Sequence, residues 1–332
     1  MKKLLSLMLT LALTAALCVC AAAEEPAEAT PEAPLYPWEH SAPTRVWGKV
    51  SPWEGEGIFL KNSNENDPLQ EVVLNVGEQT YVVDARTGLP LDLETMKEGD
   101  TLYAWVSPVM TMSLPPQMIP SVIVGNIPAD AAAPQLCEIA QNVRHPAPGD
   151  EGNPTFSLAG RGTLEVTGET VYTPWLTKQI VRMEDLIPGT RVLVWKDKNG
   201  AAEKVLVFPY AYQGYVSLTA TTHGNLLCLN GDFTAGEEAP QFPCKKAENG
   251  STMAPIRALA EAAGYDVRWD ASLGAVVSRN GETVFSVKPG AKTVQTPEGE
   301  SGLSAPCLKE DGATYLAAED LCRWLNLYYT AA

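Results

Sequence analysis

The chain has 332 residues, of which 45% are hydrophobic, with 8 tryptophans and 11 tyrosines among them. This length exceeds that of one ordinary domain, and the composition can build packed cores, which excludes wholesale disorder. The 24 basic and 40 acidic residues give a net charge of −16. Such a charge repels phosphate backbones and therefore argues against nucleic-acid binding.

The first 23 residues have the pattern of a secretory signal peptide. Lys2–Lys3 precede an apolar run over 4–19, and Ala21–Ala23 supply the small residues that stand before a cleavage site. We expect cleavage near Ala23 and therefore a secreted, extracellular protein associated with the cell envelope. The apolar run is shorter than the ~20 residues of a membrane-spanning helix, and no later run qualifies, so no transmembrane span is expected in the mature chain.

Two cysteines, Cys18 and Cys20, stand at the end of this apolar run and raise lipidation as an alternative. A lipidated cysteine follows a small residue, whereas Leu17 and Val19 precede these two. The pattern therefore favours a signal peptide without a lipid anchor. Residues 24–43 follow, and their richness in Glu, Ala and Pro predicts an extended linker, because this composition cannot bury a core.

An internal repeat organises the middle of the chain. A shift of 90 residues superimposes two segments of about 30 residues without a gap, which indicates a duplication. Each copy has an alternating strand pattern, one helical turn that ends at a glycine, and a strand that carries a tryptophan. The identical pairs are Leu74 with Leu164, Val76 with Val166, Thr80 with Thr170, Thr87 with Thr177, Glu94 with Glu184, Gly99 with Gly189 and Trp105 with Trp195.

Further strand patterns flank both copies and define two units. The first unit, residues 44–128, has strands expected over 45–50, 57–61, 73–76, 101–106 and 121–126. The second unit, residues 135–213, has strands expected over 136–142, 155–160, 164–166, 191–196 and 204–209. Five short strands with one helical turn before the fourth predict a small β-barrel, and each unit weakly resembles the OB fold.

The first unit has a connection over Ser107–Pro120 that its copy lacks, rich in proline and methionine. Methionine adapts to many partners, so this connection is a candidate contact surface, with a stiffened loop folded over the barrel end as the alternative. Tryptophans in Pro- and turn-rich loops are the other candidates, whereas those at repeat-equivalent strand positions are expected in the core. The candidate binding surface is thus Trp53, Trp175, Met110, Met112 and Met118.

The C-terminal part, residues 225–330, repeats a turn, a short strand and an amphipathic helix. The helices are expected over 255–263 and 318–326. The strands are expected over 226–230, 242–247, 266–269, 275–279, 283–288, 292–296 and 303–309. The predicted fold class is therefore mainly β, with two tandem barrels followed by an α+β part that contains a pseudo-repeat.

The first of these helices carries the pattern Pro-hydrophobic-Arg-x-Leu-Ala-Glu-x-x-Gly, and a strand that ends in Trp-Asp follows it. This pattern resembles the copper amine oxidase N-terminal-like, or stalk, domain of secreted bacterial proteins. The resemblance implies a fold and no activity. It gives a structural role to Pro255, Arg257, Leu259, Gly264 and Trp269, with the Arg257 guanidinium expected to tie the helix start to a strand carbonyl or a carboxylate, and contact with a partner as the alternative.

No residue pattern typical of catalysis or cofactor binding stands in the chain. The histidines, His40, His145 and His223, lie in three different regions, and no Asn-Tyr-Asp or Asn-Tyr-Glu occurs, so copper amine oxidase chemistry is not expected. A nucleophile elbow, a phosphate-binding loop and a dinucleotide fingerprint are also lacking. Adjacent acids such as Glu319-Asp320 are expected to face solvent. We therefore expect no metal, no cofactor and no enzymatic activity.

Five cysteines follow the signal, without the spacing of a zinc site: Cys137, Cys228, Cys244, Cys307 and Cys322. Cys244 and Cys307 are equivalent in the C-terminal pseudo-repeat and could approach each other across a two-fold axis. Small buried residues are the favoured interpretation.

These patterns predict a secreted, non-enzymatic protein of the cell envelope that binds or scaffolds. The partners expected are cell-wall glycan, a peptide or another exported protein. An exported wall or peptide hydrolase is the alternative, and it requires a pocket that gathers a histidine or cysteine with a carboxylate. A partner-recruiting sensor is the third hypothesis, and it requires an exposed apolar patch on Ser107–Pro120.

Overall fold

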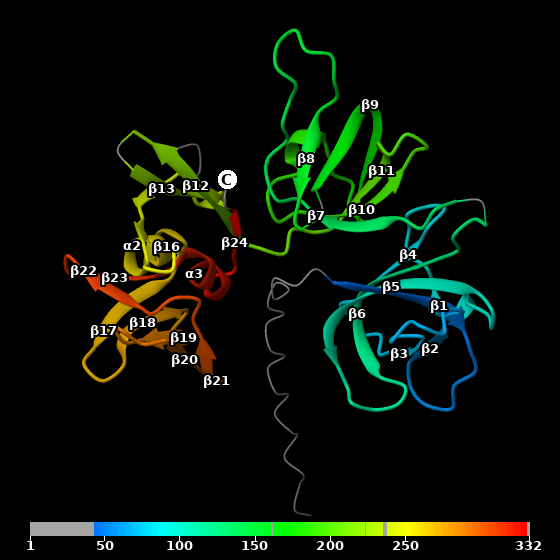
Figure 1. Ribbon diagram of the computed structural model, residues 1–332, viewed down its shortest axis with the longest axis horizontal. Helices are drawn as coiled ribbons and strands as arrows, with labels where there is room; N and C mark the ends of the chain where they lie inside the picture. The colour runs from blue at the N-terminus through cyan, green and yellow to red at the C-terminus, as the bar shows by residue number, and fades with distance from the viewer. Residues whose placement is uncertain (1–42, 130, 161, 223, 235–237, 331–332) are drawn as a thin grey trace, which may run out of the picture. The chain divides into compact units, whose positions relative to one another are not determined.

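The computed structural model describes residues 43–129, 131–160, 162–222, 224–234 and 238–330 (Figure 1). The predicted signal peptide over 1–23, and the predicted linker over 24–43 except for its last residue, lie outside the described residues. Within the described part, strands dominate and two α-helices occur, both in the C-terminal third. This composition confirms the predicted fold class.

The first barrel is a closed ring of five strands. Antiparallel pairing links them in the order β3-β2-β1-β5-β6, and the parallel pairing of β3 with β6 closes the ring. A further strand, β4, adds to β6, and the 3-10 turn η1 precedes β5. Apolar side chains such as Leu60, Leu74 and Leu102 fill the interior, as in an OB-type barrel. The bounds are β1 (Thr44–Val50), β2 (Ile58–Lys61), β3 (Glu71–Leu74), β4 (Tyr81–Asp84), η1 (Leu93–Thr95), β5 (Thr101–Met110) and β6 (Gln117–Gly125).

The second barrel repeats this arrangement. Its strands follow the order β7-β10-β11-β9-β8, and an isolated bridge between Ile139 and Leu158 completes the ring. Phe156, Leu164 and Val194 are among the side chains that fill its interior. The bounds are β7 (Gln135–Glu138), β8 (Thr155–Leu158), β9 (Gly162–Pro174), η2 (Met183–Asp185), β10 (Arg191–Lys196) and β11 (Ala202–Val207).

The two barrels also contribute to one buried cluster. Val83, Trp105 and Val124 from the first copy join Leu193 and Phe208 from the second in this shared cluster. The Tyr81 ring lies 4.6 Å from the Phe208 ring and 5.7 Å from the Trp175 ring, centroid to centroid. Burial of this much aromatic surface stabilises the pair of barrels as one unit.

The predicted connection Ser107–Pro120 is largely strand. β5 continues to Met110 and β6 begins at Gln117, with Met110 opposite Met118 in the register. The β-compatible Val and Met residues extend the pairing, while register shifts after Trp105 and Val106 accommodate the prolines. The result is a projecting β5–β6 hairpin rather than a loop folded over the barrel end.

The C-terminal part begins with a strand that sequence patterns did not predict. β12 (Gly214–Thr221) lies before the expected start of this part at residue 225, and it pairs in parallel with the last strand, β24 (Leu327–Thr330). It also forms a hairpin with β13 (Gly224–Gly231), which β14 (Gln241–Pro243) joins after the turn η3 (Asp232–Thr234). The first and last strands of this part are thereby held together.

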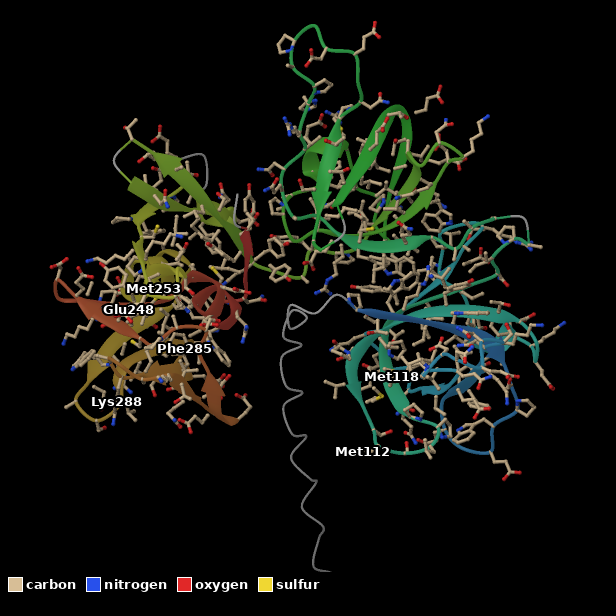
Figure 2. All side chains as sticks on the ribbon, in the orientation of Figure 1. Met112, Met118, Glu248, Met253, Phe285 and Lys288 are labelled. Atoms are coloured by element: carbon tan, nitrogen blue, oxygen red, sulfur yellow. The ribbon has the colours of Figure 1, made fainter. Side chains whose placement is uncertain are left out.

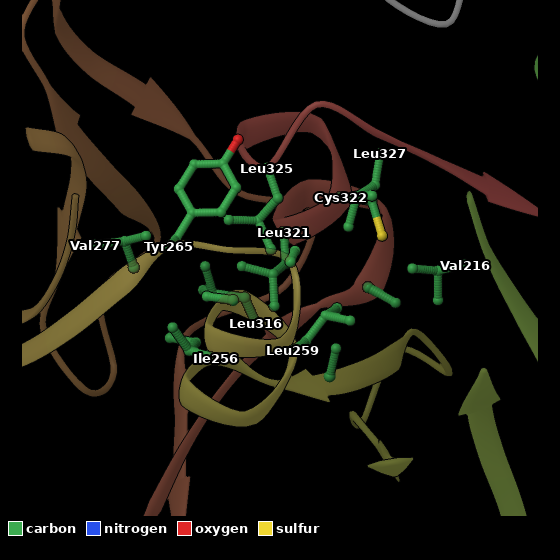
Figure 3. Close-up of a cluster of buried hydrophobic side chains, with 14 of the residues drawn as sticks. Val216, Ile256, Leu259, Tyr265, Val277, Leu316, Leu321, Cys322, Leu325 and Leu327 are labelled. Atoms are coloured by element: carbon green, nitrogen blue, oxygen red, sulfur yellow. The ribbon is translucent and has the colours of Figure 1, made fainter. Parts of the chain in front are cut away.

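The pseudo-repeat forms a second, smaller sheet in the order β15-β16-β23-β22. The two inner strands pair antiparallel, with Ala254 opposite Leu316, and each leads directly into a helix. Figure 3 shows Leu259 from the first helix and Leu321 from the second converging in one apolar cluster. The bounds are β15 (Lys245–Lys246), β16 (Thr252–Pro255), α2 (Ile256–Ala262), β22 (Leu308–Glu310), β23 (Ala313–Ala317) and α3 (Ala318–Trp324).

The same sheet order separates Cys244 from Cys307. Cys244 directly precedes β15 and Cys307 directly precedes β22, which are the two opposite edge strands. Three strand spacings of ~4.8 Å lie between these edges, a separation of roughly 14 Å, whereas a disulfide requires Cα atoms within about 7 Å. Both thiols are free. The suggested approach of these two cysteines across the two-fold axis is therefore wrong.

A third sheet is a meander of five antiparallel strands. Its order is β17-β18-β19-β20-β21, which leaves β17 and β21 at the edges. Phe285 of β19, labelled in Figure 2, is buried and packs into the same cluster as the two helices. The bounds are β17 (Asp266–Asp270), β18 (Gly274–Arg279), β19 (Glu282–Val287), β20 (Thr293–Thr296) and β21 (Gly299–Gly302).

Candidate functional site

An open groove of about 610 Å³ lies in the C-terminal part, between α2, β17 and the β22–β23 hairpin. We call it the α2–β17 groove. Its volume falls within the range of small-molecule and peptide sites, which is about 300–1,000 Å³. The side chains that give it chemical character are Arg257, Glu261, Arg268, Trp269 and Lys309.

Arg257 joins the helix to the edge strand. α2 begins after Pro255, whose fixed φ suits a helix start. From the first turn, Arg257 Nη1 donates to Glu261 Oε1 at 2.7 Å and to the carbonyl oxygen of Val267 at 2.5 Å. Both bonds are of the kind expected from the sequence. They orient the guanidinium along the groove, although more than half of the Arg257 side chain stays exposed.

Trp269 and Lys309 come from two different sheets and meet at the groove. The Lys309 Nζ lies 4.7 Å from the centroid of the Trp269 ring, a cation–π contact. Trp269 is nevertheless 51% exposed, so much of its surface remains open to a ligand. Since Trp269 belongs to β17 and Lys309 to β22, side chains from two different sheets meet in the groove.

A fixed turn supports the β17 wall. Asp270 Oδ1 accepts hydrogen bonds from the N–H and hydroxyl of Ser272 and from the N–H of Leu273. These bonds to Ser272 and Leu273 lower the pKa of Asp270 to about 2. Gly274 closes the turn at φ +85°, in the left-handed region, with its Cα against the Val287 carbonyl, where a side chain would not fit.

Lys245 holds the opposite wall. Its Nζ lies 2.8 Å from Glu310 Oε1 and 2.9 Å from Asp311 Oδ2, both in the β22–β23 hairpin. The hydrogen bonds to these two carboxylates raise the pKa of Lys245. The hairpin that presents Lys309 is therefore tied to β15.

The groove has a positive character in an acidic chain. Its lining includes three basic side chains, Arg257, Arg268 and Lys309, against one acid, Glu261. Arg268 Nη1 lies 3.6 Å from Asp270 Oδ2, so it is partly compensated. No histidine or cysteine is among the residues that line this groove. The arrangement can bind an anion beside an aromatic surface.

The structure separates the residues of the predicted binding surface. Met112 is fully exposed at the end of the β5–β6 hairpin and Met110 is half exposed, but Met118 is buried in the first barrel (Figure 2). The assignment of Met118 to an exposed surface is wrong, because Met118 lies in β6 opposite Met110 and Leu74 and its side chain is in the barrel core. Trp175 is also not an exposed contact, since it packs in the shared cluster.

Trp53 is the predicted loop tryptophan that stays partly exposed. Its ring lies 5.3 Å from that of Phe59, and its Nε1 donates to the carbonyl oxygen of Glu56 at 3.1 Å. It does not line the groove. The hairpin exposes Val109, Leu114 and Ile119 in addition to Met110 and Met112, which makes it an apolar projection.

The signature residues of the helix divide between core and groove. Leu259 is buried in the cluster of Figure 3, and Gly264 has φ +81° just after α2, as a helix stop requires. Pro255, Arg257 and Trp269 instead line the groove. Sequence patterns gave all five signature residues a structural role and did not single out Arg268 or Lys309. Arg268 and Lys309 belong to two different sheets and are distant in the sequence, so no local pattern indicates that they line one groove.

The pairing of β16 with β23, with a helix following each strand, lies within a segment that is similar to a known family. Residues 234–328 match the family model of the copper amine oxidase N-terminal domain. The match lies within the range predicted from the sequence and contains every residue that lines the groove. It indicates a non-catalytic accessory domain. None of the curated proteins matches the chain.

In the described part of the chain, no group of three or more His, Cys, Asp or Glu side chains could hold a metal ion. The helices described here are too short or too polar to cross a bilayer.

Proposed function

We propose that this chain is a secreted, non-enzymatic protein of the cell envelope that binds an anionic partner in the α2–β17 groove. The observation that carries the proposal is the gathering of Arg257, Arg268 and Lys309 around a half-exposed Trp269 in a chain of net charge −16. In such a chain, a local excess of positive charge favours an anionic ligand over the acidic remainder of the surface. The exposed ring adds apolar contact area.

Two further features support this role. The match of residues 234–328 is to an accessory domain rather than a catalytic one. Secretion is supported by the positive, apolar and small-residue pattern of residues 1–23. Carboxylate-bearing wall polymers, acidic peptides and acidic surfaces of exported proteins all offer the required charge.

Isothermal titration calorimetry on the full chain tests the proposal. Poly-L-glutamate and polygalacturonate serve as anionic probes and dextran as the neutral probe. We expect at least one anionic probe to bind, and its affinity to fall with added salt, because salt screens exposed charges. Dextran should give no heat.

Matched charge reversals locate the site. Lys309→Glu should weaken anion binding about tenfold or more, which corresponds to about 1.4 kcal/mol. Lys288→Glu is the control. It reverses the charge of an exposed lysine in the same part of the chain but outside the groove, so the anion affinity of this variant should stay near that of the wild type. Equal weakening by both variants, or no binding of either anion, would remove the groove from the proposal.

The β5–β6 hairpin favours a second, scaffolding contact with an exported protein. Its exposed apolar side chains, including Met112 and Leu114, project from the barrel, and methionine packs against varied partners. A Met112→Ser, Leu114→Ser double variant should fail to retain envelope proteins that the wild-type chain retains on a column. Equal retention by both chains would eliminate this contact.

A further inference from the structure

The free edge of β17 forms one side of the α2–β17 groove. β17 pairs with β18 alone, with Val267 opposite Val277 and Trp269 opposite Ala275. Along a strand, the N–H and C=O groups of successive residues point to alternate sides. Arg257 reaches the carbonyl of Val267 from α2, so this carbonyl points away from β18. By alternation, the N–H and C=O of Trp269 point to the same free edge.

The β22–β23 hairpin lines the same groove. β22 ends the sheet β15-β16-β23-β22, and its Lys309 lies over the ring of Trp269. The groove is therefore lined by β17 with its free edge, by the β22–β23 hairpin and by side chains of α2. An unpaired strand edge offers the hydrogen-bonding pattern to which an extended polypeptide adds.

We infer that the ligand of the groove is an acidic peptide in extended conformation that adds to the free edge of β17. This inference rests on the proposed anion-binding function. Backbone groups of the peptide pair with the N–H and C=O of Trp269, and its carboxylates face Arg268 and Lys309. The ring of Trp269 lies beside the apolar parts of the peptide side chains.

The backbone pairing distinguishes a peptide from an acidic polysaccharide. Both ligands offer carboxylates to the basic side chains, but a polysaccharide has no repeating amide groups for a strand edge. The bond from Arg257 to Val267 occupies one carbonyl of the edge in the free protein, which limits pairing with unrelated strands. Affinity then requires both the charges and an amide backbone.

Calorimetry with three probes on the full chain tests the inference. The first probe is an acetylated and amidated octapeptide of glutamate, which presents carboxylates on both faces of an added strand. The second is the same peptide N-methylated at every residue, and the third is an oligomer of galacturonate. We expect the first to bind, the second to bind at least about tenfold more weakly because it cannot donate to a strand edge, and the third not to bind.

The outcomes separate this inference from the proposed function. Equal binding of the two peptides would overturn edge addition and leave an anion-binding groove. Binding of the galacturonate oligomer without the peptides would overturn the peptide class and again leave the groove. If no anion binds, both ideas fail together.

A pair of variants tests the edge from the protein side. Trp269→Ala removes the ring alone, whereas Trp269→Pro removes the ring and the outward N–H. Proline is tolerated on an edge strand where its nitrogen faces outward, so the β17–β18 pairing should survive in both. Circular dichroism melting checks that survival. We expect Trp269→Pro to bind the peptide several-fold more weakly than Trp269→Ala, and equal affinities would contradict edge addition.

Discussion

Thr80 and Thr170, 90 residues apart, make the same pair of hydrogen bonds in the two barrels. Thr80 Oγ1 donates to the carbonyl of Pro120 at 2.8 Å, and Thr170 Oγ1 donates to that of Ala202 at 2.6 Å. Each hydroxyl also accepts from the backbone N–H three residues earlier, that of Gly77 or Thr167. Thr80, between β3 and β4, and Thr170, within β9, are therefore each tied to the last strand of their barrel.

Thr170→Val should lower the free energy of unfolding by about 1–3 kcal/mol, because it leaves a buried carbonyl without its donor. Thr170 is itself buried, whereas Thr80 is less so, and Thr80→Val should cost less. Chemical denaturation measures both. Thr163→Val, on an exposed strand position of the same barrel, is the control and should change stability by less than about 0.5 kcal/mol. A Thr170 variant as stable as the control would contradict this assignment.

Substitutions of the methionines in β5, β6 and their connection should affect stability according to how deeply each side chain is buried. Met118 faces the core of the first barrel, so Met118→Ala should destabilise by about 2–5 kcal/mol through lost burial and a cavity. Met112 is fully exposed, and Met112→Ala should be nearly neutral. Thermal melting followed by circular dichroism compares the two variants. Similar melting temperatures would show that Met118 does not lie in the core.

Asp320 is a buried acid that sequence patterns placed at the surface. It is 1% exposed, and its two carboxylate oxygens accept from the N–H of Ser304 at 2.7 Å and the hydroxyl of Ser304 at 2.9 Å. Asp320→Ala leaves both donors without this acceptor and should cost about 1.5–3 kcal/mol. The exposed Glu298→Ala serves as the control in the same denaturation experiment. An equal effect of the two substitutions would contradict a structural role for Asp320.

The hydrogen bonds accepted by Asp270 should no longer stabilise the folded chain at acidic pH. Folding lowers the pKa of Asp270 from its ordinary 3.8 to about 2, mainly through hydrogen bonds from Ser272. Because the pKa is lower in the folded state, the contribution of Asp270 to the free energy of unfolding is complete above pH 3.8 and is lost as the pH falls toward 2. The wild type should therefore exceed Asp270→Asn in melting temperature at pH 6, and the difference should shrink between pH 4 and pH 2. A difference independent of pH would contradict this linkage.

The buried thiols of the C-terminal part should resist alkylation. Burial raises the pKa of Cys307 to about 12 and raises that of Cys322 further, with a smaller contribution from the charge of Glu319. Iodoacetamide at pH 8 should leave both unmodified in the folded chain and label them after denaturation, because the thiolate is the reactive form. Mass spectrometry of peptides gives the rates, with the half-buried Cys228 as the internal comparison. Labelling of Cys322 as fast as that of Cys228 would contradict the buried position.

The elements carried by local patterns were predictable from the sequence. The turns η1 and η2 are the helical turn predicted in each copy, and Gly99 and Gly189, which follow them, have φ +90° and +88° at equivalent positions. The helix over Ile256–Ala262 follows from its apolar spacing and its stop glycine. Strands β4, β12 and β24 are among those missed, because strands stabilised by distant parallel partners carry little local signal.

The candidate site was only partly predictable for the same reason. Arg257 belongs to a recognisable helix pattern, but Lys309 reaches Trp269 through a contact between side chains of two different sheets. Neither the burial of Met118 nor that of Asp320 follows from composition. Both depend on the register and on the direction of a strand or helix relative to its neighbours.

The shared cluster limits which substitutions the two barrels can accept. Trp105 and Trp195 contribute from equivalent positions to one apolar assembly, so substitutions on that face of either copy are constrained by the other. The opposite sides carry no such mutual constraint. The connection after β10 is a tight turn fixed by Asp197, whereas the one after β5 has grown into a long hairpin. The shared packing therefore constrains one face of both copies, whereas the connection that follows the tryptophan strand differs in length between them.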